Sequence, residues 1–582
     1  MTAGDSLRGA PGRRIFAGLG DWLQPANIGL LLCAVIAGWL VLVPLAALFY
    51  TAFAEDTIFG PGAFTLQNFV DAYLGRQILG VMWSTLVFAT GTALVTFALG
   101  TAVAWVVERT DAPGRGLFHS LALMSFAIPG LLTTMAWMLV LSPNIGWVNT
   151  LMRDVFGFAE SPFNIYSMGG MIWALSSHYF PLAYLLMGPA FRVLDNRMEE
   201  AAVMSGAGTL QVASRVTLPL LRPAILSTLL LLFIRGIESF EVPRLIGMPA
   251  RIFVLTTDIQ SATAEAPPKF GIAGALGLTL LLICVIGVYL YRRATKNAEA
   301  YATVTGKGYM PTLIQLRKSR WPVTIAIGVM FFLALGLPLF TLAWQSFFRN
   351  VSPPSIAALG AMNWDNYRYI LGYPIFLNAV KNSVSLGAMA ATIVVLLTFV
   401  MAWIAQRTRT RYGWTLDVLA FIPIAIPSVI SGAAILFAYL IIPLPVYNTV
   451  WILLIAYVTM NMPYGMRFTA SGLVQIHKEL EEVAHMSGAG QFQTFRRVLL
   501  PLLAPVLIAA WLYIFVLAVR ELSASIFLAG PGTHVLGTIS LTMWEEGGSF
   551  GAVCALGIIQ ILPLIVIVMV MRRLETMVGN RG

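Results

Sequence analysis

Charged side chains are scarce in this chain. Only 11% of its 582 residues are Asp, Glu, Lys or Arg, whereas 58% are hydrophobic. Soluble globular domains carry about 25% charged residues, and a soluble protein of this size could not bury that much apolar surface. The composition therefore excludes a soluble protein and predicts an integral membrane protein.

Cysteine is also scarce. The three cysteines, Cys33, Cys284 and Cys554, each lie within an apolar run, where a free cysteine usually behaves as a small buried hydrophobe. Neither these cysteines nor the five scattered histidines show the spacing of a metal site or a disulfide framework. We therefore expect no resident metal ion.

A phosphate-binding loop of the pattern G-x-x-x-x-G-K-S/T is missing from the whole sequence. The chain is therefore expected to bind no ATP and no other cofactor itself, and it shows no catalytic constellation, so we do not expect an enzyme. Its net charge of +10 does not indicate a nucleic-acid partner, because the Lys and Arg residues cluster at the ends of apolar runs, as membrane topology requires.

Long apolar runs are what the chain does have. A helix of about 20 residues spans the hydrocarbon core of a bilayer, and continuously apolar runs favour helices over a β-barrel. The expected fold is an all-α integral membrane protein in the lipid bilayer. Twelve runs are long enough to cross: 28–53, 78–107, 117–141, 168–191, 223–246, 270–291, 322–348, 378–405, 416–442, 448–470, 504–529 and 550–571.

The distribution of Lys and Arg predicts how these spans are oriented. If the N-terminus is inside, the inner segments hold 26 Lys and Arg residues and the outer loops hold 8. Because cytoplasmic loops carry the excess of basic residues, we expect a multi-pass protein of the bacterial inner (plasma) membrane with both termini in the cytoplasm.

A duplicated polar segment interrupts the apolar runs. Residues 199–223 (EEAAVMSGAGTLQVASRVTLPLLRP) match residues 481–505 (EEVAHMSGAGQFQTFRRVLLPLLAP) at 16 of 25 positions without a gap. Weaker matches, such as Ala127-Ile128-Pro129 with Ala425-Ile426-Pro427, extend the repeat at an offset of 298 rather than 282. The chain therefore consists of two parallel six-span repeats. The first half carries about 16 extra residues near 142–167, an external loop that could hold a short interfacial helix.

These repeats define the expected domains. Residues 1–27 form a cytoplasmic N-terminus, and residues 28–295 form the first half, with the polar insert at 192–222. Residues 296–321 form a basic cytoplasmic linker. Residues 322–582 form the second half, with its insert at 467–503.

Each insert is predicted to form a short helix, a glycine turn and a second short helix along the membrane surface. In the first copy a helix is expected over 195–205, because its paired acids lie where the helix dipole favours negative charge. Gly206-Ala207-Gly208 then allows a sharp turn. The second helix is expected to end at Pro219, where the next span starts.

At these residues the chain resembles the permeases of ABC importers. The signature of that family is Glu-Ala-Ala, three residues, Gly, and then Leu-Pro thirteen residues later. The resemblance implies the fold of type I ABC importer permeases, with each insert a coupling helix in a groove of a separate ATP-binding subunit. The implied coupling residues are Glu199, Glu200, Ala201, Ala202, Gly206, Ala207, Gly208, Leu218 and Pro219, and in the second copy Glu481, Glu482, Ala484, Gly488, Ala489, Gly490, Leu500 and Pro501.

The same resemblance implies the partners. Two copies of a cytoplasmic ATP-binding subunit would use ATP and Mg²⁺, and a periplasmic substrate-binding protein would deliver the substrate. The stretch Glu238-Ser239-Phe240-Glu241-Val242-Pro243 resembles the fused two-permease proteins of the ferric-iron importer group. Related permeases import thiamine, polyamines or phosphonates, so these substrates stay open. A rival from another class is a secondary transporter driven by an ion gradient.

Five charged residues within the predicted spans are singled out, because placing a charge in the membrane costs free energy and indicates a function. They are expected either to line the pathway or gate it, or to form internal ion pairs that fix helix packing. Three residues of the fifth span, spaced three apart, are expected on one helix face. The five are Arg235, Glu238 and Glu241 in the first half and Arg520 and Glu521 in the second.

Overall fold

The structure is a computed structural model. It describes residues 25–56, 62–75, 78–125, 127–194, 196–295, 313–408, 410–547 and 549–579. The described residues form helices joined by loops, with two isolated β-bridges and no longer strand. Most of the predicted linker 296–321 and most of the predicted N-terminal segment 1–27 lie outside the described residues, so these two boundaries stay predictions.

Twelve helical segments coincide with the twelve predicted runs. Eight are long and apolar enough to cross a membrane by themselves, and two bent pairs bring the number to ten within the described residues. The eight are α2 (Pro25–Phe53), α4 (Ile78–Arg109), α11 (Leu218–Glu238), α13 (Phe270–Thr295), α14–α15 (Arg320–Phe331 and Leu337–Gln345), α18 (Phe376–Arg407), α24 (Leu500–Val519) and α27 (Phe550–Gly579). The other two predicted runs form α8 (Met168–Val193) and α21 (Val450–Gln475), which occupy equivalent places in the two repeats.

The third span of each half is broken. The helices α5 (Arg115–Ser125) and α6 (Gly130–Leu141) meet at 106°, and α19 (Trp414–Phe421), continued by a short turn, meets α20 (Ser428–Ile441) at 108°. The predicted runs 117–141 and 416–442 therefore each form a sharply bent pair of helices and not one continuous helix. The reason lies in Pro129 and Pro427, each in extended conformation directly before the second helix. Proline cannot donate a backbone hydrogen bond, and it moves the preceding residue out of the helical region.

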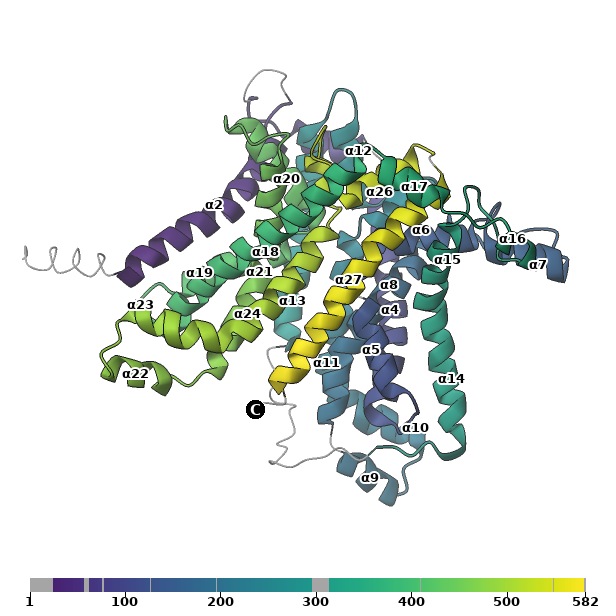
Figure 1. Cartoon of the computed structure of the whole chain (residues 1–582), viewed down its shortest axis with the longest axis horizontal. Coiled ribbons are helices and arrows are strands. Elements are labelled where there is room, and N and C mark those ends of the chain that lie inside the picture. Colours follow the sequence, from purple (N-terminus) through teal and green to yellow (C-terminus); the bar gives the residue numbers. More distant parts are fainter. Residues whose placement is uncertain are drawn as a thin grey trace, which may run out of the picture.

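The two halves are interlocked through their first spans. Helix α2 of the first half packs against α19 and α20 of the second half, where Trp39 Nε1 donates to the Tyr439 hydroxyl at 3.0 Å. In exchange, the first span of the second half packs on α5, α6 and α8, and Phe331 stacks on Phe118 with ring centroids 5.5 Å apart. The buried apolar clusters accordingly contain residues of both halves. The halves therefore form one continuous bundle (Figure 1).

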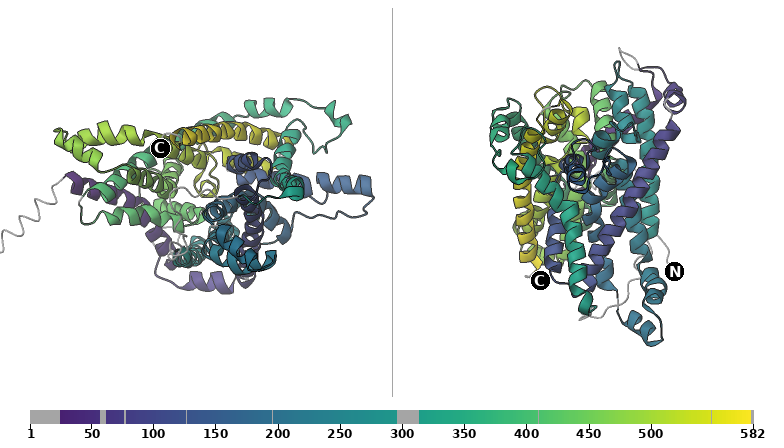
Figure 2. Two further views of the ribbon diagram at one scale, coloured as in Figure 1. Left: turned by 90° about the horizontal axis from the view of Figure 1, so that it is seen from below. Right: turned by 90° about the vertical axis from the view of Figure 1, so that its right-hand side faces the viewer.

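The elements that connect the spans gather at the two ends of this bundle. Helices α9 (Asn196–Met204) and α22 (Glu479–Met486) of the repeated inserts lie at one end, on opposite sides of it (Figure 1). Helices α12 (Leu255–Ala264), α17 (Asp365–Gly372) and α26 (Leu536–Glu545) lie at the other end. The side view shows the same order, with the insert of the first half beyond the lower end of the spans (Figure 2). The remaining short helices are α3 (Gln67–Leu74), α7 (Trp147–Phe156), α10 (Thr209–Val212), α16 (Ile356–Leu359), α23 (Gln491–Thr494) and α25 (Ser525–Leu528).

Glycine permits the closest contact between α4 and α8. A Cβ atom on Gly100 would lie 2.3 Å from the Cβ of Ala183 and 2.5 Å from the carbonyl oxygen of Phe180. Replacing Gly100 with valine is therefore expected to destabilise the protein by about 1–3 kcal/mol through overpacking, seen as a lower Tm in detergent. Gly328→Val in α14 is the matched control, because a Cβ there would meet no atom within 4 Å. Equal loss of Tm in both variants would contradict this packing.

Candidate functional site

The glycine turn of each insert has a left-handed backbone. Gly206 has φ +87° and Gly488 has φ +82°, and a Cβ on either residue would meet nothing within 4 Å. Glycine is therefore required there for its backbone conformation and not for space. In both copies the following alanine closes the turn, because Ala207 N donates to the Ala202 carbonyl and Ala489 N to the Ala484 carbonyl, each at 3.0 Å.

The first glutamate of each insert is tied to its own half. Glu199 forms an ion pair with Arg109 at the end of α4 and accepts a hydrogen bond from the Thr217 hydroxyl at 2.6 Å. The Arg109 side chain is only 2% exposed and also donates to the Leu194 carbonyl. Glu481 forms an ion pair with Arg407, with Nε 3.3 Å from Oε1, although Arg407 Nη2 donates its hydrogen bonds to the carbonyls of Leu473 and Ile476. These two glutamates, predicted as coupling residues, anchor the inserts inside the protein.

The outer surface of each insert carries exposed acidic side chains and exposed apolar side chains. Glu200 and Glu482, one residue after the anchoring glutamates, are exposed. Met204 and Met486, which are equivalent in the repeat, are 87% and 88% exposed, and Leu210 is 85% exposed. Methionine adapts to irregular partner surfaces, and large apolar side chains this exposed at one end of the bundle favour contact with another protein.

The second helix of each insert runs directly into the next span. A five-residue π-helical turn, Ala213–Thr217 in the first copy and Phe495–Leu499 in the second, joins the insert to α11 or α24. The prediction that this helix ends before Pro219 was therefore wrong. Pro219 and Pro501 lie in the first turn of the span, where a missing N–H is tolerated. Leu210–Glu238 is one unbroken helix of 29 residues.

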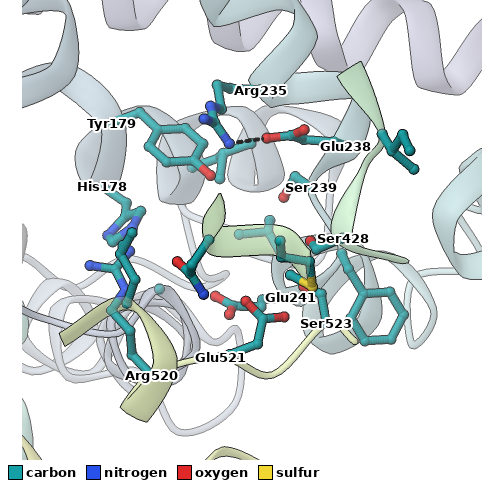
Figure 3. A pocket seen from close by; sticks show the side chains of 18 of the residues that line it. His178, Tyr179, Arg235, Glu238, Ser239, Glu241, Ser428, Arg520, Glu521 and Ser523 are labelled. Carbon is teal, nitrogen blue, oxygen red and sulfur yellow. Dashed lines mark hydrogen bonds and ion pairs between the residues drawn. The ribbon is translucent and has the colours of Figure 1, made fainter. Parts of the chain in front are cut away.

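A polar cavity lies between the halves where the broken spans and these long helices meet. It has a volume of about 200 Å³. All five charged residues predicted within the spans line it, and Figure 3 shows them on facing elements. Gly130 and Ser428, the first residues of α6 and α20, also line it. The breaks in the third spans therefore open onto the cavity.

The charged groups of the cavity are held by several contacts. Arg235 pairs with Glu238 one turn further along α11, and its Nη2 donates to the hydroxyl of Tyr464 in the second half at 3.1 Å. Glu521 accepts a hydrogen bond from Ala524 N at 2.9 Å. Glu241 accepts one from Leu131 N, at the N-terminus of α6, where the helix dipole favours a carboxylate. The structure therefore shows an internal ion pair, Arg235–Glu238, and all five charged residues at one cavity. Their role in a pathway or gate stays a prediction.

One detail of the prediction was wrong. Helix α11 ends at Glu238, and Ser239 is already extended, so Glu241 does not lie on one helix face with Arg235 and Glu238. Likewise α24 ends at Val519, before Arg520 and Glu521. The chain leaves the helix here because the cavity provides polar groups that replace the helical hydrogen bonds.

Sequence reasoning assigned no place in a site to the uncharged polar residues of the cavity: Thr134, His178, Tyr179, Ser239, Ser428, Asn461, Tyr464 and Ser523. It also missed an ion pair between the halves at the α12 and α26 end. Arg244 Nε lies 2.7 Å and Nη2 3.1 Å from the two carboxylate oxygens of Glu545. Gln260 accepts a third hydrogen bond from Arg244 at 3.1 Å. The one available signal was that Arg244 is among the few basic residues outside the predicted inner segments.

Two parallel sets of membrane helices around a shared polar cavity, with paired surface helices at one end, define a permease, a protein that conducts a solute across a bilayer. The chain belongs to the family described as binding-protein-dependent transport system inner membrane component, which matches residues 97–298 and 394–581. One matched segment lies in each repeat. The protein is therefore a multi-pass inner-membrane permease of an ABC importer.

Three relatives illustrate the range of similar proteins. The ferric transport system permease protein FbpB of Actinobacillus pleuropneumoniae is 25% identical over 93% of this chain and 77% of its own length. A Haemophilus influenzae protein named as a ferric transport system permease is 25% identical over 87% of this chain and 79% of its own length. A Salmonella paratyphi A protein whose name assigns it to 2-aminoethylphosphonate transport is 27% identical over 46% of this chain and its whole length.

The Arg109–Glu199 pair is expected to hold α9 in place. Arg109→Ala would leave Glu199 and the Leu194 carbonyl without this partner, and breaking a buried pair costs about 3 kcal/mol. We expect amide hydrogen exchange across 198–204 to accelerate by about 100-fold. Arg368→Ala is the control, because the side chains of Arg368 and its partner Asp365 are 80% and 73% exposed and such a pair is worth at most about 1 kcal/mol. Similar exchange in both variants would refute the anchoring role.

Proposed function

We propose that α9 and α22 seat two copies of a separate ATP-binding subunit on the cytoplasmic side of the membrane. The observation that carries this proposal is the duplicated, exposed Met204 and Met486 surface beside a left-handed glycine turn in each insert. Each insert is anchored to its own half by a buried arginine, so a force applied to α9 or α22 is transmitted to the spans. The excess of Lys and Arg in the same segments supports the cytoplasmic side and cytoplasmic termini.

Two long helices link α9 and α22 to the cavity. Leu210–Glu238 runs unbroken from the exposed Leu210 to Glu238 at the cavity, a distance of about 44 Å at 1.5 Å per residue. Phe495–Val519 provides the equivalent connection to Arg520 in the second half. Closure of the ATP-binding subunits would therefore move the cavity wall of both halves together and switch access between the two sides.

The cavity is the proposed translocation path. Arg235, Glu238, Glu241, Arg520 and Glu521 form its charged lining, and the Arg235–Tyr464 hydrogen bond joins the halves across it. The Arg244–Glu545 ion pair closes the periplasmic end, where a periplasmic substrate-binding protein would dock and deliver its ligand. ATP and Mg²⁺ belong to the partner subunit in this scheme.

Ferric iron is the proposed substrate. Two similar proteins that match most of this chain are named as ferric transport permeases, and three carboxylates line the cavity, a ligand type that hard cations prefer. Within the described residues no group of three His, Cys, Asp or Glu side chains could hold a metal ion. The carboxylates would therefore make transient contacts that permit release. Phosphonate, thiamine and polyamines are the alternative substrates.

The glycine turns test the coupling mechanism. Gly206→Val and Gly488→Val place a β-branched residue at positive φ, which costs about 1–2 kcal/mol per residue. Both substitutions should therefore distort the turns that position α9 and α22. In proteoliposomes with the ATP-binding subunits and binding protein of the neighbouring genes, we expect uptake of ferric iron to fall by at least about tenfold. Gly114→Val, at φ +76° and exposed in the loop between α4 and α5, is the control and should transport normally.

The same assay separates the rival classes. Uptake by an ATP-driven importer is lost when the ATP-binding subunit is omitted and is unchanged by an uncoupler. Uptake by a secondary transporter is lost with an uncoupler and does not require the ATP-binding subunit. Uptake of 2-aminoethylphosphonate in place of iron would leave the mechanism intact and change the substrate. Normal iron uptake by the Gly206→Val and Gly488→Val variants would contradict the coupling role.

The Arg244–Glu545 pair tests the closed periplasmic end. Both side chains are partly exposed, so the pair stabilises the closed state by about 1 kcal/mol, or about fivefold in population. We expect Arg244→Ala to raise ATP hydrolysis of the complex without binding protein by up to that factor. The charge-swapped variant, Arg244→Glu with Glu545→Arg, should restore the low rate. A high rate in the swapped variant would rule out the ion pair as the closing contact.

A further inference from the structure

The loop between α6 and α8 contains an amphipathic helix whose apolar side is exposed. Helix α7 (Trp147–Phe156) places its apolar residues on one continuous arc and its polar residues on the opposite arc. Leu151, Val155 and Phe156 are 52%, 64% and 64% exposed, although they are large and apolar. Phe158, directly after the helix, is 49% exposed.

The polar arc of α7 is turned toward its own loop. The Asn149 amide is fully buried and donates to the carbonyls of Ser142 at 3.0 Å and Phe163 at 2.8 Å. Arg153, one turn later, donates to the carbonyls of Pro143 and Asn144 at 3.4 and 3.3 Å. These bonds fix the rotation of α7, so its apolar arc must point away from the loop.

The position of Trp147 sets the depth of α7 relative to the spans. Its ring contacts Phe340 with centroids 6.2 Å apart. Phe340 lies five residues before Gln345, the last residue of α15, which corresponds to about 8 Å along the helix. A helix that lies in the membrane interface buries its apolar face about 5–10 Å into the boundary between headgroups and acyl chains. Helix α7 therefore begins at interfacial depth.

The surroundings of α7 favour lipid over a protein partner. Phe340 is itself 45% exposed on the outside of a membrane span, so the exposed face of α7 continues that apolar surface. Helix α7 extends sideways from the bundle and does not lie over its end, where α12 and α26 are (Figure 1). The seen-from-below view shows the same sideways projection (Figure 2).

We propose that α7 is an interfacial anchor whose ligand is the phospholipid surface of the leaflet opposite α9 and α22. Leu151, Val155, Phe156 and Phe158 insert among the acyl chains, and Asp154 stays in the headgroup layer. The anchor belongs to one half only, because the equivalent connection of the second half, 442–449, contains no helix. Since α7 follows α6 closely, it holds at fixed depth the helix that starts at the cavity.

Site-directed fluorescence quenching tests this anchor. Val155→Cys and Asp154→Cys, adjacent residues on the apolar and polar arcs, are each labelled with a small fluorophore on the full chain in phospholipid nanodiscs. The native cysteines are buried, and the unsubstituted protein measures background labelling. With nitroxide-labelled phosphatidylcholine, we expect quenching at position 155 to exceed that at position 154 by about threefold, with the reverse order for aqueous iodide.

Other outcomes would overturn the proposal. Equal quenching of both positions by both agents would place α7 in water. If the label at position 155 is accessible to iodide and becomes shielded only when a periplasmic binding protein is added, the apolar arc is a protein docking surface. Neither result depends on the transported substrate or on ATP, so this test stands apart from the transport assays.

Discussion

Every backbone polar group within the hydrocarbon must find a partner inside the protein, and the remaining architecture depends on this constraint. It keeps α11 and α24 helical through the proline-containing segments at Pro219 and Pro501, so each insert is joined to the cavity by an unbroken helix. It also confines the interruptions at 127–129 and 426–427 to a place where protein and a polar cavity surround them. The unbroken helices that leave the inserts and the cavity between the halves therefore have one physical origin.

Duplication produced a two-fold scaffold with an asymmetric interior. The inserts keep the same anchoring pairs, Arg109–Glu199 and Arg407–Glu481, as our proposal of two identical partner subunits requires. In the cavity, by contrast, Glu238 corresponds to Arg520 in the 282-residue register of the repeat. The charged lining therefore differs between the halves, whereas the anchoring of the inserts does not. We propose that the symmetric inserts transmit movements of the partner subunits to the spans, and that the asymmetric lining of the cavity selects the solute.

Much of the candidate site could be predicted because membranes penalise unnecessary charge. The five charged residues singled out from the apolar runs all line one cavity, and the duplicated insert forms the same turn twice. The role of Glu199 could not be predicted, because its partner Arg109 is 90 residues away in sequence. Glu241 was misplaced for a similar reason: helix periodicity continues through Ser239 in the sequence, whereas the chain leaves the helix there.

The sequence by itself determined the spans, the parallel repeat and the positions of the glycine turns, because hydropathy, periodicity and backbone freedom are local properties of the chain. Only the tertiary structure decided that α2 and the first span of the second half exchange places between the halves, that Arg244 meets Glu545, and that α7 exposes its apolar arc. These features depend on which surfaces face each other across hundreds of residues, and no local pattern records that pairing.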